Sequence, residues 1–128
     1  MDRLLLLSAA EITAVPTFLQ DAAVTALQTD PSPMREVYRK RREYVCSRLR
    51  DMGLSFPEPE GAFYVFVDIR KVGIDSGTFC TRTIQEGKGA AVPGSCFGAE
   101  GYIRLSYCYS DGELKKGLDR MEAFLKTL

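Results

Sequence analysis

The sequence contains no histidine and no tryptophan. Without histidine it cannot form a Ser-His-Asp or Cys-His nucleophile system, or the common histidine-containing zinc sites. Its four cysteines are widely spread with no Cys-x-x-Cys pair, which favours buried free thiols in a reducing compartment over a disulfide framework. Acidic and basic residues balance at 17 each, so no overall field attracts nucleic acid or an anionic membrane surface.

The N-terminal apolar run, Leu4 to Leu7, is far too short to cross a membrane or to serve as a signal-peptide core. The sequence therefore predicts a cytoplasmic protein with no membrane partner and no nucleic-acid partner. A chain of 128 residues fits one domain. Four leucines just inside the start nevertheless suggest that the chain begins partway through a larger fold.

Two helices are expected in the first part of the chain. The first lies within residues 11–29, after Pro16, where apolar residues recur at helical spacing. Ser32 is then expected to cap a long helix that runs to about Met52 and ends at Gly53. The basic run at 39–42 resembles a nucleic-acid patch, but no aromatic platform accompanies it, so a solvated helix face is favoured.

Two shorter helices are expected later. Ser76 is predicted to cap a helix of about ten residues whose inward side chains are Phe79, Thr83 and Ile84. Ser110, followed three positions later by Glu113, matches the capping box that opens a helix. The apolar residues of that last helix form a stripe typical of a core-facing surface: Leu114, Leu118, Met121, Leu125 and Leu128.

Residues 62–69 form the clearest strand. Phe63, Val65 and Val67 fall on one face, and Tyr64, Phe66 and Asp68 on the other, which predicts a central strand covered on both sides. Further strands are expected at 90–92 and 102–107, with an edge segment at 54–59. Together these elements predict an α+β fold, a small and mainly antiparallel sheet of three to four strands with helices packed on one face.

The main candidate functional residue, Arg104, lies in the strand expected at 102–107. Ile103 and Leu105 share one face, so Arg104 lies on the other. A guanidinium donates two parallel hydrogen bonds to a carboxylate, so Arg104 is a candidate anion-binding residue. The pattern alone favours a surface or structural salt bridge. The preceding glycine-rich turn is expected to serve backbone geometry, and no complete catalytic constellation is visible.

Three motifs follow one another along the chain in the order found in a known protein family. They are Glu60 to Phe66, then Val92 to Ser95 with Phe97-Gly98, and finally Gly101 to Tyr107. With these, the sequence resembles the C-terminal part of class I/II aminotransferases, the pyridoxal-phosphate enzymes of fold type I, especially the aspartate aminotransferase-like branch. The resemblance implies that Arg104 grips the α-carboxylate of the substrate. It also implies that Phe63 is an aromatic residue close to that arginine.

The resemblance places the Schiff-base lysine and the other cofactor-binding residues of the family upstream of this chain. No catalytic residue, cofactor-binding residue or metal ligand is therefore assigned here, and the isolated chain is expected to bind no pyridoxal phosphate and to be inactive. The full-length parent would be a pyridoxal-phosphate homodimer that acts on amino acids and 2-oxo acids. Residues 1–30 are predicted as a remnant of the connection from a missing large domain, and 31–128 as the C-terminal small domain.

Two alternatives remain open at this point. The chain is either a catalytic enzyme's domain, as above, or a non-catalytic binding or dimerisation module that exposes apolar surface. The parent could also be a lyase or decarboxylase of the same fold type, because a fold does not fix a reaction.

Overall fold

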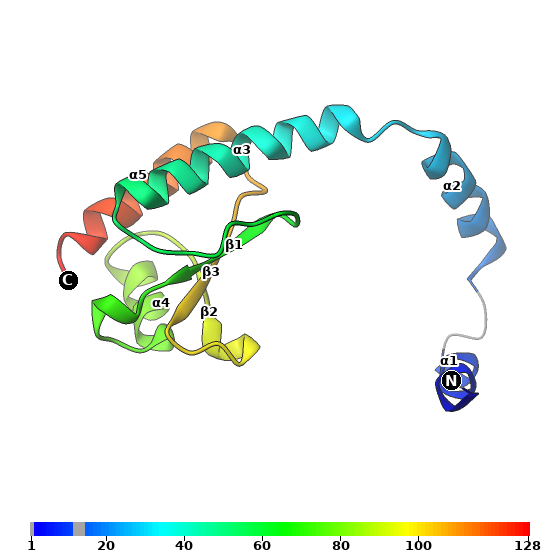
Figure 1. Ribbon diagram of the computed structural model, residues 1–128, viewed down its shortest axis with the longest axis horizontal. Coiled ribbons are helices and arrows are strands. Elements are labelled where there is room, and N and C mark those ends of the chain that lie inside the picture. The colour runs from blue at the N-terminus through cyan, green and yellow to red at the C-terminus, as the bar shows by residue number, and fades with distance from the viewer. Residues whose placement is uncertain (1, 12–14) are drawn as a thin grey trace. The chain divides into compact units, whose positions relative to one another are not determined.

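The computed structural model describes residues 2–11 and 15–128 (Figure 1). The chain divides into two compact units, the first ending at Pro33 and the second running from Met34 to Leu128. The interpretation of residues 1–30 as a connection from a larger domain stays a prediction.

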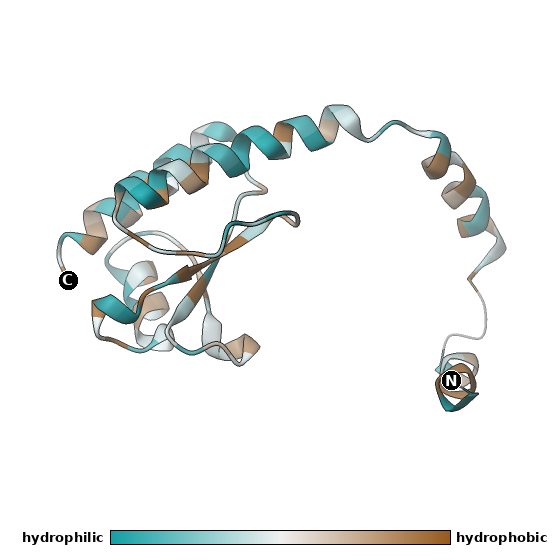
Figure 2. Ribbon diagram, viewed as in Figure 1, coloured by the Kyte–Doolittle hydropathy of each residue, from teal (hydrophilic) through white to brown (hydrophobic). Residues whose placement is uncertain are grey.

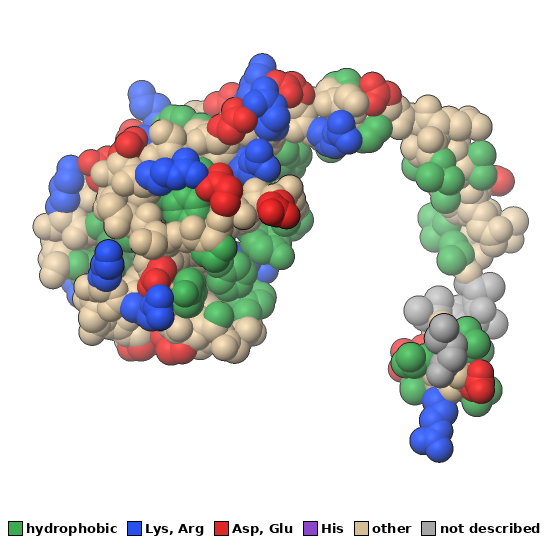
Figure 3. Space-filling model, in the orientation of Figure 1, with side chains coloured by type: hydrophobic (Ala, Val, Ile, Leu, Met, Phe, Trp, Pro, Cys, Tyr) green, Lys and Arg blue, Asp and Glu red, His purple; other side chains and the backbone are tan. Residues whose placement is uncertain are grey.

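The N-terminal unit holds two helices, α1 (Asp2–Glu11) and α2 (Thr17–Gln28), and neither contains a buried residue. Helix α2 confirms the helix expected after Pro16; residues 12–14 of that expected range lie outside the described residues. Helix α1 differs from the sequence expectation, which contains no helix there, although leucine and alanine are strong helix formers. Apolar residues lie along both helices (Figures 2 and 3), and Leu27 is 88% exposed.

Helix α3 (Ser32–Asp51) begins and ends close to the predicted positions. The predicted cap at Ser32 is wrong in its chemistry: Ser32 is already the first helical residue, and the Asp30 carboxylate accepts its backbone N–H at 2.9 Å. At the other end Gly53 adopts a φ of 75°. The N–H of Leu54 bonds the Leu49 carbonyl at 3.0 Å, which closes the helix as expected for a glycine C-terminal cap.

The sheet contains β1 (Tyr64–Asp68), β2 (Val92–Pro93) and β3 (Tyr102–Ser106) in the order β1-β3-β2, with antiparallel pairing throughout. This confirms the predicted α+β class and antiparallel sheet. The prediction that residues 62–69 form the central strand is wrong, because β3 lies between the other two. The predicted edge segment at 54–59 contributes a single bridge, Ser55 to Asp68. Two prolines limit the hydrogen bonds that this segment can donate.

The core lies on one face of the sheet, where α3, α4 (Ser76–Gln85) and α5 (Asp111–Leu125) cover it. Figure 1 shows α3 and α5 side by side, and ion pairs from Arg48 to Asp119 and Glu122 join them. This confirms the prediction of helices on one face. The core side chains of the strands are Val65, Val67, Ile103 and Leu105. Phe63, expected on the same face as Val65, is instead 52% exposed because the strand begins only at Tyr64.

Helix α4 is capped by Asp75 and not by Ser76 as predicted: the Asp75 carboxylate accepts the Thr78 N–H at 2.8 Å. Phe79 and Thr83 face the core as expected, whereas Ile84 is 57% exposed and Cys80 takes an inward position. Cys80 lies one residue after Phe79, so the buried stripe of this helix is turned slightly from the predicted one.

Helix α5 begins as the capping box predicts, with the Ser110 hydroxyl accepting the Glu113 N–H at 3.4 Å. Leu114, Leu118 and Met121 are buried, but Leu128 is 44% exposed because the helix ends at Leu125. Phe124 completes the buried face instead. Among the helices of the described ranges, none is both long and apolar enough to cross a membrane.

At Gly94, the turn before β3 leaves no room for a side chain. A Cβ atom at Gly94 would lie 2.1 Å from the Ala99 carbonyl oxygen and 2.4 Å from that of Tyr102. We expect Gly94→Ala to lower the free energy of unfolding by about 1–3 kcal/mol, because backbone atoms must move. Gly117→Ala is the matched control: nothing lies within 4 Å of its added methyl in α5, so it should stabilise by about 0.5–1 kcal/mol.

Urea unfolding followed by tyrosine fluorescence measures both glycine variants. All six tyrosines lie in the C-terminal unit and the chain has no tryptophan, so this signal reports that unit alone. Equal effects of the two substitutions would contradict the close backbone approach at Gly94.

The four cysteines are free, but only Cys46 and Cys80 are buried; Cys96 and Cys108 are exposed, so the prediction of buried thiols is wrong for these two. Burial raises the pKa of Cys80 to about 11 and also raises the pKa of Cys46. Because the thiolate is the reactive form, we expect the exposed Cys96 and Cys108 to react quickly with iodoacetamide at pH 8. The buried Cys46 and Cys80 should react only after unfolding. Peptide mass spectrometry would identify them, and fast labelling of Cys80 would contradict this burial.

Candidate functional site

Arg104 lies at the centre of the sheet face that the helices leave open. It stands in β3 directly opposite Phe66 of β1 and Val92 of β2. Its neighbours Ile103 and Leu105 are buried in the core, so alternation along the strand directs Arg104 to the other side. Pairing on both edges of β3 fixes the backbone from which this side chain projects.

Aromatic rings surround the guanidinium. Its Cζ atom lies 4.5 Å from the ring centroid of Phe97 and 5.3 Å from that of Tyr64. Phe66 joins the two rings edge to face, with centroids 5.5 Å from Phe97 and 6.0 Å from Tyr64. These distances fall within the range of cation–π attraction and of favourable aromatic pairs.

Arg104 differs from the other partly buried arginines in its polar contacts. Four of them each donate a hydrogen bond to a carboxylate or a carbonyl: Arg41, Arg42, Arg48 and Arg82. Within residues 2–11 and 15–128, Arg104 has neither an acidic partner nor a hydrogen-bond acceptor. A salt bridge inside this part of the chain therefore does not account for its position, and its in-plane N–H donors remain free for an anion.

Phe63, the second predicted site residue, lies in the turn before β1. The N–H of Tyr107 donates to the Phe63 carbonyl at 2.9 Å, and the Tyr107 hydroxyl donates to the Ala62 carbonyl at 3.1 Å. The Phe63 ring contacts Tyr64 edge to face at 5.6 Å. Tyr64 thus contacts both predicted site residues, and among the described residues no hydrogen bond or cation–π contact joins Phe63 to Arg104.

Sequence reasoning missed Tyr64 and Phe97 as members of the site. Alternation places Tyr64 on the face opposite Val65, but the register that brings this face to Arg104 comes from pairing between distant strands. Phe97 lies in a 3₁₀ turn, η2 (Gly94–Phe97), where no periodic pattern signals its direction. The sequence points to Phe97 only through its place in the motif just before β3, the strand that contains Arg104.

Glu100 anchors the loop that carries Phe97. Its carboxylate accepts the backbone N–H of Ser76 at 2.7 Å and of Gly101 at 2.9 Å, and the Ser76 hydroxyl donates to it at 3.0 Å. The Ser76 N–H and then the Gly101 N–H hold the pKa of Glu100 below its usual value. The Ser76 hydroxyl also accepts the Ser95 N–H at 3.3 Å, so the start of α4 fixes both ends of the loop.

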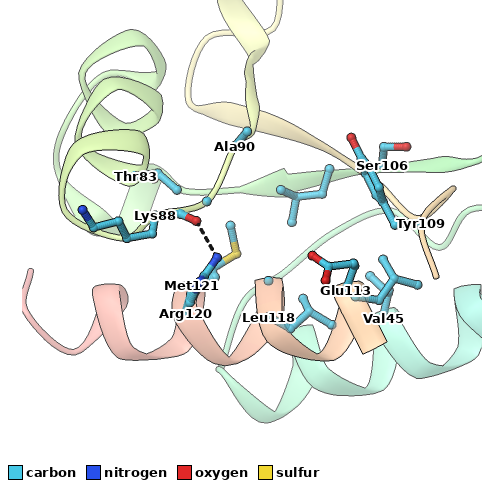
Figure 4. Close-up of a pocket in the computed structure, with 14 residues that line it drawn as sticks. Val45, Thr83, Lys88, Ala90, Ser106, Tyr109, Glu113, Leu118, Arg120 and Met121 are labelled. Carbon is cyan, nitrogen blue, oxygen red and sulfur yellow. Dashed lines mark hydrogen bonds between the residues drawn. The ribbon is translucent and has the colours of Figure 1, made fainter. Parts of the chain in front are cut away.

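A cavity of about 210 Å³ lies elsewhere, between β3, α5 and the loop after α4 (Figure 4). Its apolar lining includes Leu105, Leu118 and Met121, and an Arg120 guanidinium N–H donates to the Lys88 carbonyl at 3.1 Å. Arg104 and the rings around it do not line this cavity. The open sheet face and the cavity are therefore separate features.

Comparison with known proteins identifies the family. Residues 3–121, a range that includes every site residue above, match the family described as aminotransferase class I and II. The chain belongs to this aminotransferase family. It is 43% identical over 115 residues to an aspartate aminotransferase of Thermotoga maritima, and 43% identical over 121 residues to an aromatic-amino-acid aminotransferase of Thermococcus litoralis. The match covers 90% and 89% of this chain.

Solved aminotransferase structures agree. The crystal structure of the Thermotoga maritima aspartate aminotransferase matches 94% of this chain with a TM-score of 0.86 at 41% identity. An aromatic aminotransferase from Pyrococcus horikoshii matches 98% with a TM-score of 0.87 at 38% identity. The chain spans only 30% and 31% of the length of the two sequence relatives, and 31% and 36% of the two solved chains. It corresponds to about a third of such an aminotransferase.

The family implies pyridoxal phosphate, and the residues of this chain do not fit that cofactor. A Schiff-base lysine requires a desolvated position beside the substrate. All six lysines are exposed to solvent: Lys40, Lys71, Lys88, Lys115, Lys116 and Lys126. None is among the residues that contact Arg104. No chemical step is therefore assigned to a cofactor held by this chain.

Proposed function

We propose that this chain is the substrate-carboxylate-binding part of a pyridoxal-phosphate-dependent aminotransferase that transfers an amino group between an amino acid and a 2-oxo acid. Arg104 would hold the α-carboxylate through two parallel hydrogen bonds, and Phe63 would contact the substrate nearby. One observation carries the proposal: in a chain of this family, the arginine at the centre of the open sheet face uses none of its donors within the described residues.

The relatives favour aminotransfer over the lyase and decarboxylase alternatives. Their names describe aminotransferases that act on aspartate or aromatic amino acids. These names support a reaction type for the parent and leave the side-chain specificity of this chain open.

Pyridoxal phosphate would be held by the portion of the enzyme outside this chain, which would supply the electron sink for the reaction. We further propose that residues 1–30 connect a large domain to the small domain at 31–128, and that the complete enzyme is a homodimer. Four free cysteines support a cytoplasmic location, where thiols stay reduced.

A chimera tests the proposed function. In it, this chain replaces the matching segment of the Thermotoga maritima aspartate aminotransferase, with which it shares 43% identity. We expect the chimera to bind pyridoxal phosphate, seen by its absorbance, and to transfer the amino group of aspartate to a 2-oxo acid. The same enzyme truncated before the segment is the negative control. A folded, cofactor-loaded chimera without aminotransferase activity would contradict the proposal.

Exposed apolar surface favours a second candidate, a non-catalytic dimerisation module. Helices α1 and α2 contain no buried residue, and Leu4, Leu6 and Phe18 are 71%, 71% and 72% exposed. Such surface typically marks an interaction site. Light scattering during size-exclusion chromatography would show a dimer for this candidate. A monomer at all concentrations would remove it.

A further inference from the structure

The two aromatic rings beside Arg104 have a role that the carboxylate-binding proposal does not assign. Phe97 is 47% exposed, and Tyr64 is only partly buried, so neither is a core residue. Among the described residues, Arg104 is the one partly buried arginine without a polar partner. Core packing alone does not explain why two partly exposed aromatic rings lie beside it. Figure 3 shows hydrophobic side chains gathered on the surface of this unit.

The chemistry of a guanidinium explains the arrangement. Its five N–H donors lie in the molecular plane, whereas an aromatic ring attracts the cation through its face. Cation–π contacts with Phe97 and Tyr64, at 4.5 and 5.3 Å, therefore restrain Arg104 without using the donors that a carboxylate needs. A carboxylate partner within the chain would also restrain the side chain, but it would occupy those donors.

The rings are themselves held in place. Phe66 contacts both of them edge to face, and it stands opposite Arg104 in the sheet. The turn that carries Phe97 is closed by the Gly98 N–H bond to the Ser95 carbonyl at 3.1 Å. After the turn, the Glu100 carboxylate accepts the N–H of Gly101 and also that of Ser76, the first residue of α4. These bonds link the loop to α4. These hydrogen bonds hold the backbone on either side of Phe97, and so they set the position of its ring.

We propose that Phe97 and Tyr64 are positioning residues that hold the Arg104 guanidinium ready for a planar carboxylate. This inference rests on the proposed function, because it assigns the carboxylate to Arg104. It predicts that the rings act on substrate binding and not on the chemical step. A restraint that favours ground state and transition state equally changes KM and leaves kcat unaltered.

The first test uses the 128-residue chain itself and nuclear magnetic resonance of the arginine Nε–Hε groups. Arg104→Lys assigns the Arg104 signal. In the unaltered chain we expect this signal to be shifted by ring currents away from that of the exposed Arg35. Phe97→Leu, which keeps apolar volume but removes the ring, should move it back, and Phe97→Tyr should not. An Arg104 signal that is the same with and without the Phe97 ring overturns the inference.

Acetate serves as the carboxylate probe in the same samples. We expect the acetate concentration that half-saturates the Arg104 shift to rise about 3- to 30-fold in Phe97→Leu, and to stay within about twofold in Phe97→Tyr. Equal half-saturating acetate concentrations for Phe97→Leu and Phe97→Tyr overturn the inference. So does an Arg104 signal in the unaltered chain that does not respond to acetate. Tyr64→Leu is the second ring-removing variant, and tyrosine fluorescence confirms that each variant is folded.

The chimera supplies the kinetic test. Phe97→Leu should raise KM for the amino-acid substrate about 3- to 30-fold and change kcat by less than about twofold. Tyr109→Leu is the control, because Tyr109 is 58% exposed and makes no ring contact with Arg104. An active chimera whose KM is unaffected by Phe97→Leu overturns the inference but leaves the proposed function intact. A folded, cofactor-loaded chimera without activity contradicts the proposed function, and the resonance and acetate measurements then decide the inference alone.

Discussion

Replacing Arg104 with alanine in the chimera is expected to lower kcat/KM by about 10- to 150-fold. A hydrogen bond to a charged group contributes about 1.5–3 kcal/mol, and each 1.36 kcal/mol corresponds to a tenfold change in rate. The effect should be large because no other arginine is described beside the Phe97 and Tyr64 rings. Arg104→Lys keeps the charge but loses the planar fork, so its loss should be smaller than that of alanine.

Arg120→Ala is the control for charge removal. Arg120 is exposed on α5 and bonds only the Lys88 carbonyl in the described structure, so kcat/KM should change by less than about twofold. A loss below about tenfold for Arg104→Ala, in a chimera that still binds the cofactor, would count against the carboxylate role. Comparing KM for amino-acid and 2-oxo-acid substrates would show whether both carboxylates use the same arginine.

Phe79→Ala is expected to lower the free energy of unfolding of the C-terminal unit by about 3–5 kcal/mol. The Phe79 side chain is 0% exposed and contacts Phe124 edge to face at 5.6 Å. Truncation leaves a cavity between α4 and α5 and also removes this aromatic pair. Because small domains have only about 5–15 kcal/mol of total stability, the variant should unfold at much lower urea concentration. Tyrosine fluorescence during urea titration measures this loss.

Ile84→Ala on the same helix provides the comparison. Ile84 is 57% exposed, so its truncation should change the free energy of unfolding by no more than about 0.5 kcal/mol. Similar losses for Phe79→Ala and Ile84→Ala would mean that α4 buries a different face from the one described. The pair therefore tests the rotation of this helix as well as the strength of the core.

Local chemistry explains why some elements were predictable. The Ser110–Glu113 capping box, the stop at Gly53 and the alternation around Arg104 each depend on residues a few positions apart. The Asp75 cap was missed because two neighbouring polar residues, Asp75 and Ser76, compete for one capping position. Ser76 is used elsewhere, in a bond to Glu100 that joins residues 24 positions apart.

The sequence by itself determined the α+β class, the antiparallel sheet and the candidate role of Arg104, because alternation, turn residues and family motifs are local in the chain. Only the tertiary structure decided that β3 is central and that Tyr64 and Phe97 lie beside Arg104. Strand order and register depend on contacts between distant segments, such as Phe66 with Arg104. The direction of Phe97 depends on a glycine-supported turn held by α4, and no residue period encodes it.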